Sequence, residues 1–198
     1  MDAHQTAGDK TIKVLVWDKF VRVFHWSLVL SFTAAYLTAE YGYDEIHEWL
    51  GYFIAVLILT RLIWGFVGSK YARFSSFIFA IPAYFKNFKA IISNQHDEHY
   101  LGHNPLGGAM VFALLAGLLT LIFSGLILLG WSEYTGPVWA MGIPVSEALA
   151  DFSKFVHYEV PELMLLLIAA HILGVLAAMY QHGENLVRSM FDGYKNKA

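Results

Sequence analysis

The sequence predicts an all-α integral membrane protein: a four-helix bundle with an additional interfacial helix between the second and third spans. Three observations support this fold class. The 198 residues are 57% hydrophobic and only 15% charged, whereas soluble domains have about 45–50% apolar and about 25% charged residues. Four segments approach the about 20 residues that cross a hydrocarbon core of about 30 Å. Basic residues collect on alternate connections between these segments. We expect residues 1–198 to form one domain.

The four expected spans cover residues 20–41, 47–67, 107–130 and 156–181. Each is expected to be helical, because every backbone N–H and C=O in lipid needs a partner within its own segment. The third span is the most uniform and contains no charged residue. The polar start of the chain is too long for a cleaved signal peptide, and the first apolar run is too long for its hydrophobic core.

The distribution of lysine and arginine predicts the orientation of the bundle. Twelve of the thirteen lie at the N-terminal end, near or after the end of the second span, or in the C-terminal tail. Lys154 is the exception, and it lies among acidic residues in a connection on the other side. Cytoplasmic connections are rich in basic residues. Both termini are therefore expected in the cytoplasm, with residues 131–155 facing the periplasm.

Residues 74–92 are predicted to form a helix in the cytoplasmic membrane interface. Apolar residues recur at helical spacing, whereas Lys86 and Lys89 lie off this stripe. Pro82 is expected to kink the helix or split it in two. An ordinary cytoplasmic helix packed on the bundle is an equally compatible alternative. The stripe consists of Phe74, Phe77, Ile78, Ile81, Phe85, Phe88 and Ile92.

Histidine is the residue type that indicates a function. The chain has nine histidines and no cysteine, which excludes thiolate-held iron–sulfur clusters, c-type haem attachment and disulfides. His25, His47, His157 and His171 lie within or at the edge of the predicted spans. A polar side chain at such a position is costly and is a functional candidate by default.

The spacing of these four histidines predicts two pairs at two depths. His157 and His171 are 14 residues apart, so they share one helix face and lie about 21 Å apart along the axis. Antiparallel spans place His47 level with His157, and His25 level with His171. Two bis-imidazole haems, with His47/His157 and His25/His171 as the axial ligands of their irons, fit this arrangement. The alternative is four structural hydrogen bonds between helices, and a kink at Pro161 would blur the phase but not the depths.

Four further residues are candidate haem contacts. Gly51 follows His47 by one turn and Gly174 follows His171 by three residues, which leaves room for a macrocycle; close helix packing is the alternative. Arg22 precedes His25 and Lys154 precedes His157, each by three residues. Each of these two cations is positioned for a haem propionate, or alternatively extends only to the interface.

The remaining histidines carry no functional prediction. His96, His99 and His103 are expected in a solvated cytoplasmic loop, although their spacing would also allow a metal ion. His4 and His182 lie near polar ends of the chain.

The chain resembles the bacterial b561-type di-haem cytochromes, the family that includes the b-type cytochrome subunit of nickel–iron hydrogenases. The resemblance extends over nearly the whole chain. It is carried by W-D-K-F-V-R-V-F-H-W (residues 17–26), H-E-W-L-G-Y (47–52), R-L-I-W-G-F-V-G-S (61–69), A-R-F-S-S-F (72–77), G-H-N-P-L-G-G (102–108), and the fourth span with its two histidines, ending in E-N-L-V-R-S-M (184–190).

The resemblance implies two haems b, ligated from the first, second and fourth spans of a protein in the bacterial inner membrane. It also implies electron exchange between the quinone pool and a second partner, either a periplasmic hydrogenase or a c-type cytochrome. We therefore predict an electron-transfer subunit, or alternatively a stand-alone superoxide:quinone oxidoreductase. A haem-free proton-coupled transporter is a further alternative. No catalytic residue is assigned, and no nucleic-acid partner is expected. Asp18, Arg61 and Arg73 are candidate quinone contacts, with membrane anchoring as the alternative for each.

Overall fold

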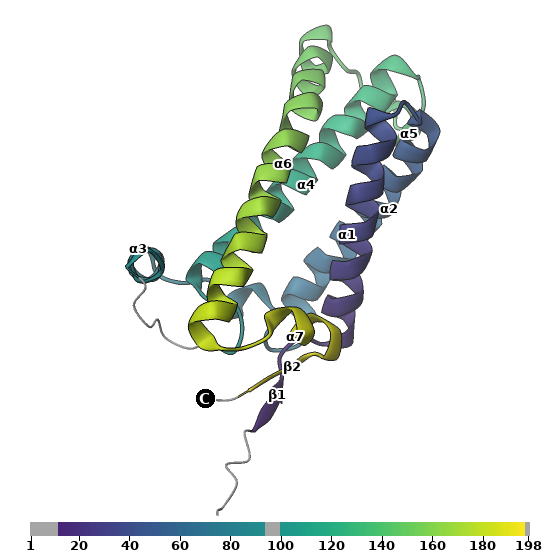
Figure 1. Cartoon of the computed structure of the whole chain (residues 1–198). Coiled ribbons are helices and arrows are strands. Elements are labelled where there is room, and N and C mark those ends of the chain that lie inside the picture. The colour runs from purple at the N-terminus through teal and green to yellow at the C-terminus, as the bar shows by residue number, and fades with distance from the viewer. Residues whose placement is uncertain (1–11, 94–99, 197–198) are drawn as a thin grey trace, which may run out of the picture.

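Four long helices dominate the computed structural model, which describes residues 12–93 and 100–196. They are α1 (Lys19–Glu40), α2 (Asp44–Val67), α4 (Pro105–Ser132) and α6 (Glu147–His182), and each is long and apolar enough to cross a membrane (Figure 1). The predicted all-α membrane fold with four spans is thereby confirmed. The shorter elements are β1 (Lys13–Leu15), η1 (Phe74–Ser76), α3 (Ile81–Ile92), α5 (Gly136–Ala140), α7 (Leu186–Asp192) and β2 (Tyr194–Asn196).

Local capping explains where three of the long helices begin. Asp18, Asn104 and Ser146 precede α1, α4 and α6, and each accepts a hydrogen bond from the amide three residues ahead. Such caps satisfy amides that a helix start leaves without partners. The cap at Ser146 starts α6 well before the predicted residue 156, so the connection from α4 is shorter than expected. The helix then continues through Pro161 and ends at Gly183, whose φ of +63° favours glycine.

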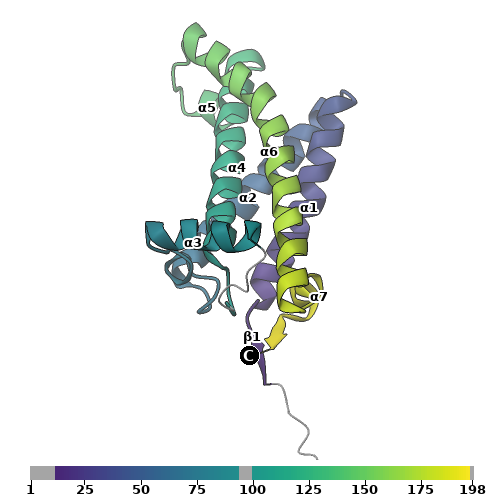
Figure 2. The same ribbon diagram turned by 60° about the vertical axis from the view of Figure 1, so that its left-hand side comes forward.

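The spans form two antiparallel helical hairpins. Helix α1 packs along α2, and α4 packs along α6, while α2 and α4 join the two hairpins (Figures 1 and 2). Helix α6 approaches α1 and α2 at only a few positions. The joint core includes Phe24, Ile58, Leu118 and Met164. Large apolar side chains also remain exposed on all four spans, as expected for helices that face lipid.

The structure corrects the prediction of a single helix over residues 74–92. Phe74 and Phe77 are 8% and 0% exposed and belong to the core. Helix α3 begins only at Ile81, with Pro82 in its first turn, where a missing N–H costs no helical hydrogen bond. It lies across the direction of the spans (Figure 2). The rest of the stripe that can be described is exposed, namely Ile78, Ile81, Phe85 and Phe88.

Both ends of the described chain meet at the end of the bundle that also carries α3 and α7 (Figure 1). Strand β1 pairs antiparallel with β2, with Val14 opposite Lys195. Lys195 is 9% exposed; its Nζ donates to the Tyr100 carbonyl at 2.9 Å and lies 3.5 Å from Glu184 Oε2. This two-stranded sheet was not predicted from the sequence, and it fixes the C-terminal segment beneath the spans.

Candidate functional site

The first predicted histidine pair lies at the end of the bundle that carries α5. His47 is in the first turn of α2 and His157 is in α6; their ring centroids are 6.0 Å apart and their planes are nearly perpendicular, at 88°. Two imidazoles bound to opposite sides of one metal ion have centroids about 6 Å apart, because each metal–nitrogen bond is about 2.0 Å and each ring radius about 1.1 Å. The separation fits a shared metal.

Each imidazole of this pair is oriented through its Nδ1 atom. His47 Nδ1 donates to the Ala35 carbonyl at 2.9 Å. His157 Nδ1 lies 2.9 Å from Ser124 Oγ, and this hydroxyl donates to the Leu121 carbonyl at 3.1 Å. Ser124 Oγ therefore accepts a hydrogen bond from His157 Nδ1–H. In the neutral form of both imidazoles, Nε2 is then able to bind a metal, and such hydrogen bonds commonly orient metal-binding histidines.

The second predicted pair lies at the end that carries α7. The imidazoles of His25 and His171 are close enough to interact electrostatically. The ring of His25 also meets Trp26 edge-on, with centroids 5.1 Å apart. Trp26 in turn stacks on Phe191 and donates to the Met190 carbonyl. Helix α7 therefore supports the side chain adjacent to His25. The structure thus brings the rings of His47 and His157 together, and His25 and His171 interact electrostatically.

Glycines around the histidines leave space on the helix surfaces. A Cβ atom at Gly51 or Gly174 would meet nothing within 4 Å, so the close-packing interpretation of these two glycines is wrong. A Cβ atom at Gly125 would come within 2.9 Å of His157 Cε1. Gly125 thus leaves room for the His157 ring against α4, and Ser124 binds it there. Nothing in the sequence of α4, which has no histidine, indicates this role.

The predicted cations differ in their environments. Arg22 donates from its guanidinium to the Phe191 carbonyl, so it links α1 to the C-terminal segment. Lys154 is exposed one turn before His157, and Arg73 is exposed in the connection after α2.

Asp18 is a structural residue that joins α1 to α2. Its carboxylate accepts hydrogen bonds from the Val21 amide at 2.8 Å, Trp64 Nε1 at 3.0 Å and Ser69 Oγ at 2.6 Å. Burial alone would raise the pKa of this carboxyl, but the hydrogen bonds from Ser69, Val21 and Trp64 outweigh burial and lower it. These three donors fully account for the position of Asp18 in the fold.

The prediction that His103 lies in a solvated loop is wrong. Its ring lies between Trp17 and Phe77, with centroid distances of 4.8 and 4.7 Å. Burial, assisted by the charge of Arg61, lowers the pKa of His103 to about 3, so the imidazole is neutral. His96 and His99 lie outside the described residues. Within the described part of the chain, no three metal-ligating side chains form a cluster.

Arg61 is the most deeply buried charged residue described. It is 4% exposed, and its Nη2 donates to the Ala72 carbonyl at 3.1 Å. Its guanidinium carbon lies 4.9 Å from the centre of the Phe74 ring. Its other terminal nitrogen, Nη1, is buried without a hydrogen-bond partner among the described residues.

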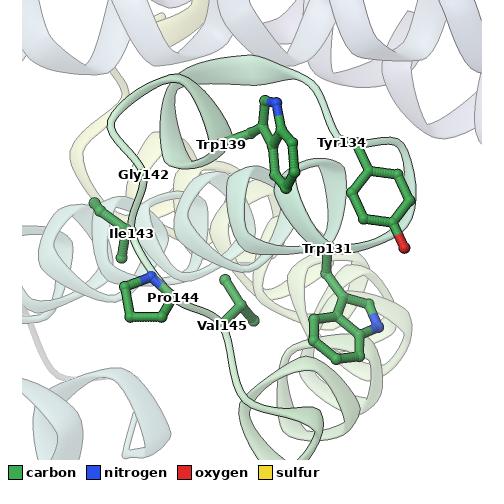
Figure 3. Close-up of a pocket in the computed structure, with 8 residues that line it drawn as sticks. Trp131, Tyr134, Trp139, Gly142, Ile143, Pro144 and Val145 are labelled. Carbon is green, nitrogen blue, oxygen red and sulfur yellow. The ribbon is translucent and has the colours of Figure 1, made fainter.

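Aromatic side chains line an open pocket beside α5, in the connection between α4 and α6 that was expected to face the periplasm. Trp131, Tyr134 and Trp139 line it together with Pro144 and Val145 (Figure 3). The three aromatic residues are 41%, 63% and 54% exposed. The end of the bundle that carries the His47/His157 pair therefore also presents an apolar aromatic surface.

Comparison with known proteins agrees with this architecture. Residues 16–193 match the model of a family described as prokaryotic cytochrome b561. The chain is similar to proteins named "probable Ni/Fe-hydrogenase B-type cytochrome subunit" from Bradyrhizobium diazoefficiens (27% identity; 67% of this chain and 64% of the relative) and Rhizobium leguminosarum bv. viciae (25%; 97% and 92%). A similarly named protein, the hydrogenase 1 subunit of Escherichia coli K12, is 24% identical, with 66% of each chain covered. The match thus spans about two thirds of the length of two of these relatives. No solved structure matches.

Proposed function

The chain belongs to the prokaryotic cytochrome b561 family, and from this premise we propose that it carries electrons through two b haems between the quinone pool and a periplasmic redox partner. The family and the relatives support the more general function, membrane electron transfer by a b-type cytochrome. The number of haems, the quinone and the partner are the parts that we add.

In this proposal, His47 and His157 hold one haem, and His25 and His171 hold the other. The observation that carries it is the His47–His157 separation of 6.0 Å, with each Nδ1 bound to a protein oxygen. Haem supplies one-electron chemistry when bound, and the protein tunes it through axial ligands, burial and hydrogen bonds.

The other residues around the histidines orient and accommodate the haems. Gly51 and Gly174 face open space, which supports a macrocycle lying against α2 and α6. Arg22 and Lys154 are proposed to bind propionates at their own ends of the bundle, since each lies one turn from a ligand. The few contacts that α6 makes with α1 and α2 agree with haems filling the space between them.

We assign the α5 end to the periplasm and the α7 end to the cytoplasm of a bacterial inner membrane. The excess of lysine and arginine at the α7 end supports this orientation. The exposed aromatic surface around Trp131 and Trp139 is then the docking surface for a hydrogenase or a c-type cytochrome. Quinone would exchange electrons at the cytoplasmic end, and the exposed apolar residues of α3 would lie in the membrane interface there.

The haem proposal is tested by an absorption spectrum of the purified full chain in detergent, before and after reduction. We expect a b-type spectrum and two haems per chain by the pyridine haemochrome assay. His171→Ala should remove one haem and His47→Ala the other, because each substitution removes an axial ligand. Ile172→Ala, at an exposed neighbour of His171, should retain both. A chain without haem, or two histidine variants that lose the same haem, would contradict the proposal.

The partner assignment needs a separate measurement. Added quinol should reduce the haems of the purified chain. A hydrogenase or c-type cytochrome should exchange electrons with these haems only when the aromatic surface around Trp139 is intact. Trp139→Ala should weaken that exchange while leaving reduction by quinol unchanged. Rapid turnover of superoxide by the chain alone would instead favour a stand-alone oxidoreductase.

A further inference from the structure

Buried nitrogen atoms without hydrogen-bond partners gather at one end of the molecule. Among the described residues there are four in side chains: Arg22 Nε, His25 Nδ1, Arg61 Nη1 and His103 Nδ1. All four belong to the level of the His25/His171 pair or lie below it, whereas His47 and His157 are both satisfied. Buried polar groups are rarely left unpaired, because each costs free energy. The two arginine nitrogens can only donate, and each histidine Nδ1 donates in the tautomer that is protonated there. A hydrogen-bond acceptor would therefore satisfy all four.

Arg61 is directed into this region by its position on α2. It follows His47 by 14 residues, the same spacing as between His157 and His171, so it lies on the same face of α2 as His47 but about 21 Å further along the axis. This places Arg61 at the level of the second histidine pair. Its side chain extends toward the α7 end, where it reaches the Ala72 carbonyl.

The positive charge of Arg61 lacks a counter-charge in contact with it. Asp18 interacts with it electrostatically, but the carboxylate of Asp18 already accepts from Val21, Trp64 and Ser69. Lys195, the other buried cation at this end, is paired with Glu184. A buried charge that has no partner is strongly unfavourable. The acceptor missing from Arg61 is therefore expected to be an anion.

His103 provides the second side of the same site. Phe77, which packs on His103, also packs on Phe74, and the Phe74 ring lies beneath the guanidinium of Arg61. One aromatic cluster therefore joins His103 to Arg61, and the charges of Arg61 and His171 both influence its imidazole. The rings of Trp17 and Phe77 hold it in place. Its Nδ1 is buried and unpartnered, like the Nη1 of Arg61.

We propose that Arg61 and His103 form a buried binding site for a carboxylate, namely one propionate of the haem held by His25 and His171. This inference rests on the proposed function. A carboxylate satisfies the guanidinium with charge as well as with hydrogen bonds. The carbonyl oxygen of a quinone would supply an acceptor but leave the buried charge uncompensated, so a carboxylate is the better fit.

The charge of Arg61 should favour the reduced form of the nearby haem. Arg61→Gln removes that charge. At a fixed applied potential, we expect the ratio of reduced to oxidised haem at this level to fall about tenfold, which corresponds to a midpoint potential lowered by 59 mV for one electron. The haem at the His47/His157 level should not change, because it lies about 21 Å away. Arg61→Lys should restore most of the ratio. Arg188→Gln is the matched control, since Arg188 is an exposed arginine at the same end with no role in the proposed site.

Redox-induced infrared difference spectra give the direct test, using the full chain loaded with haem whose propionate carboxyls carry 13C. The labelled carboxylate bands should shift in Arg61→Gln and in His103→Gln, but not in Arg188→Gln. If Arg61→Gln fails to retain the second haem, His103→Gln provides the same readout with Arg61 present. Unchanged propionate bands in both variants would overturn the proposal, and shifts confined to the carbonyl bands of added quinone would assign the site to quinone. A wild-type chain without two haems would instead contradict the proposed function.

Discussion

The hydrogen bond between Ser124 and His157 allows a quantitative test of how the protein tunes one haem. Ser124 is 5% exposed, and its Oγ lies 2.9 Å from His157 Nδ1. Ser124→Ala would leave the Nδ1–H group of His157 buried without this acceptor. An unsatisfied buried donor costs about 1–3 kcal/mol. This range agrees with the about 10- to 100-fold loss of metal affinity that follows from removing such a partner.

The same substitution should raise the potential of the haem at the His47/His157 level. A hydrogen bond from Nδ1–H makes the imidazole a stronger base and favours oxidised iron. If its loss costs the oxidised state about 1 kcal/mol more than the reduced state, the midpoint potential rises by about 40 mV. The other haem should stay within the error of the measurement, because its ligands do not contact Ser124.

The assay is a potentiometric titration of the purified full chain in detergent, with the haem content measured in the same sample. Thr120→Ala is the matched control: it removes a hydroxyl that bonds a carbonyl on the same helix, but from an exposed position one turn away. Equal shifts of both titration steps would refute the reasoning, as would the same shift in Thr120→Ala.

Three further predictions concern packing and stability. Gly65→Ala should lower the unfolding temperature in detergent, because its methyl group would collide with the Phe74 ring at a cost of about 1–3 kcal/mol. Gly174→Ala, whose methyl group would meet no neighbour, should leave the unfolding temperature of the haem-free chain unchanged but weaken haem binding at the His25/His171 level. A larger loss of unfolding temperature in Gly174→Ala than in Gly65→Ala would contradict the packing. The pKa of Asp18 in the folded chain is lowered from its ordinary value of 3.8. Between the lowered value and 3.8, the unfolded chain therefore binds more protons than the folded chain. The stability that Asp18 contributes is present above pH 3.8 and is lost as the pH falls through the lowered value. Asp18→Asn should reduce this acid sensitivity when thermal unfolding is followed from pH 6 to well below pH 3.8. An unchanged profile would exclude Asp18 as its source. Trp26→Phe should keep the stacking on Phe191 but lose the hydrogen bond to the Met190 carbonyl, at a cost of about 1 kcal/mol. Proteolysis of the C-terminal segment should therefore become faster. An unchanged rate of proteolysis would show that α7 does not depend on that hydrogen bond.

Much of the fold was predictable because the bilayer restricts the possible structures. Span number follows from hydrophobic length, and helicity follows from the need to satisfy the backbone in lipid. The two histidine pairs were predictable for a related reason: antiparallel spans convert position in the sequence into depth. Pairing by depth placed His47 beside His157, and the structure brings these two rings together. Their role as haem ligands stays a prediction.

The failures of prediction lie in the connections, where no such restriction applies. The apolar periodicity of residues 74–92 did not distinguish side chains that face lipid from those that enter the core. Phe74 and Phe77 enter the core, and the helix begins only at Ile81. His103 belongs to a polar segment, so composition indicated solvent. The packing of Trp17 and Phe77 around it decided otherwise.

By itself, the sequence determined the membrane class, the four spans and the histidines that share a level, because each depends on distance along a helix axis. Only the tertiary structure decided which partner each side chain has. It placed Ser124 against His157, gave Asp18 three donors within the fold, and left Arg61 and His103 buried without acceptors. The physical reason is that hydrogen bonds act over about 3 Å. Periodicity defines a depth and a face of a helix, but not a position at that precision.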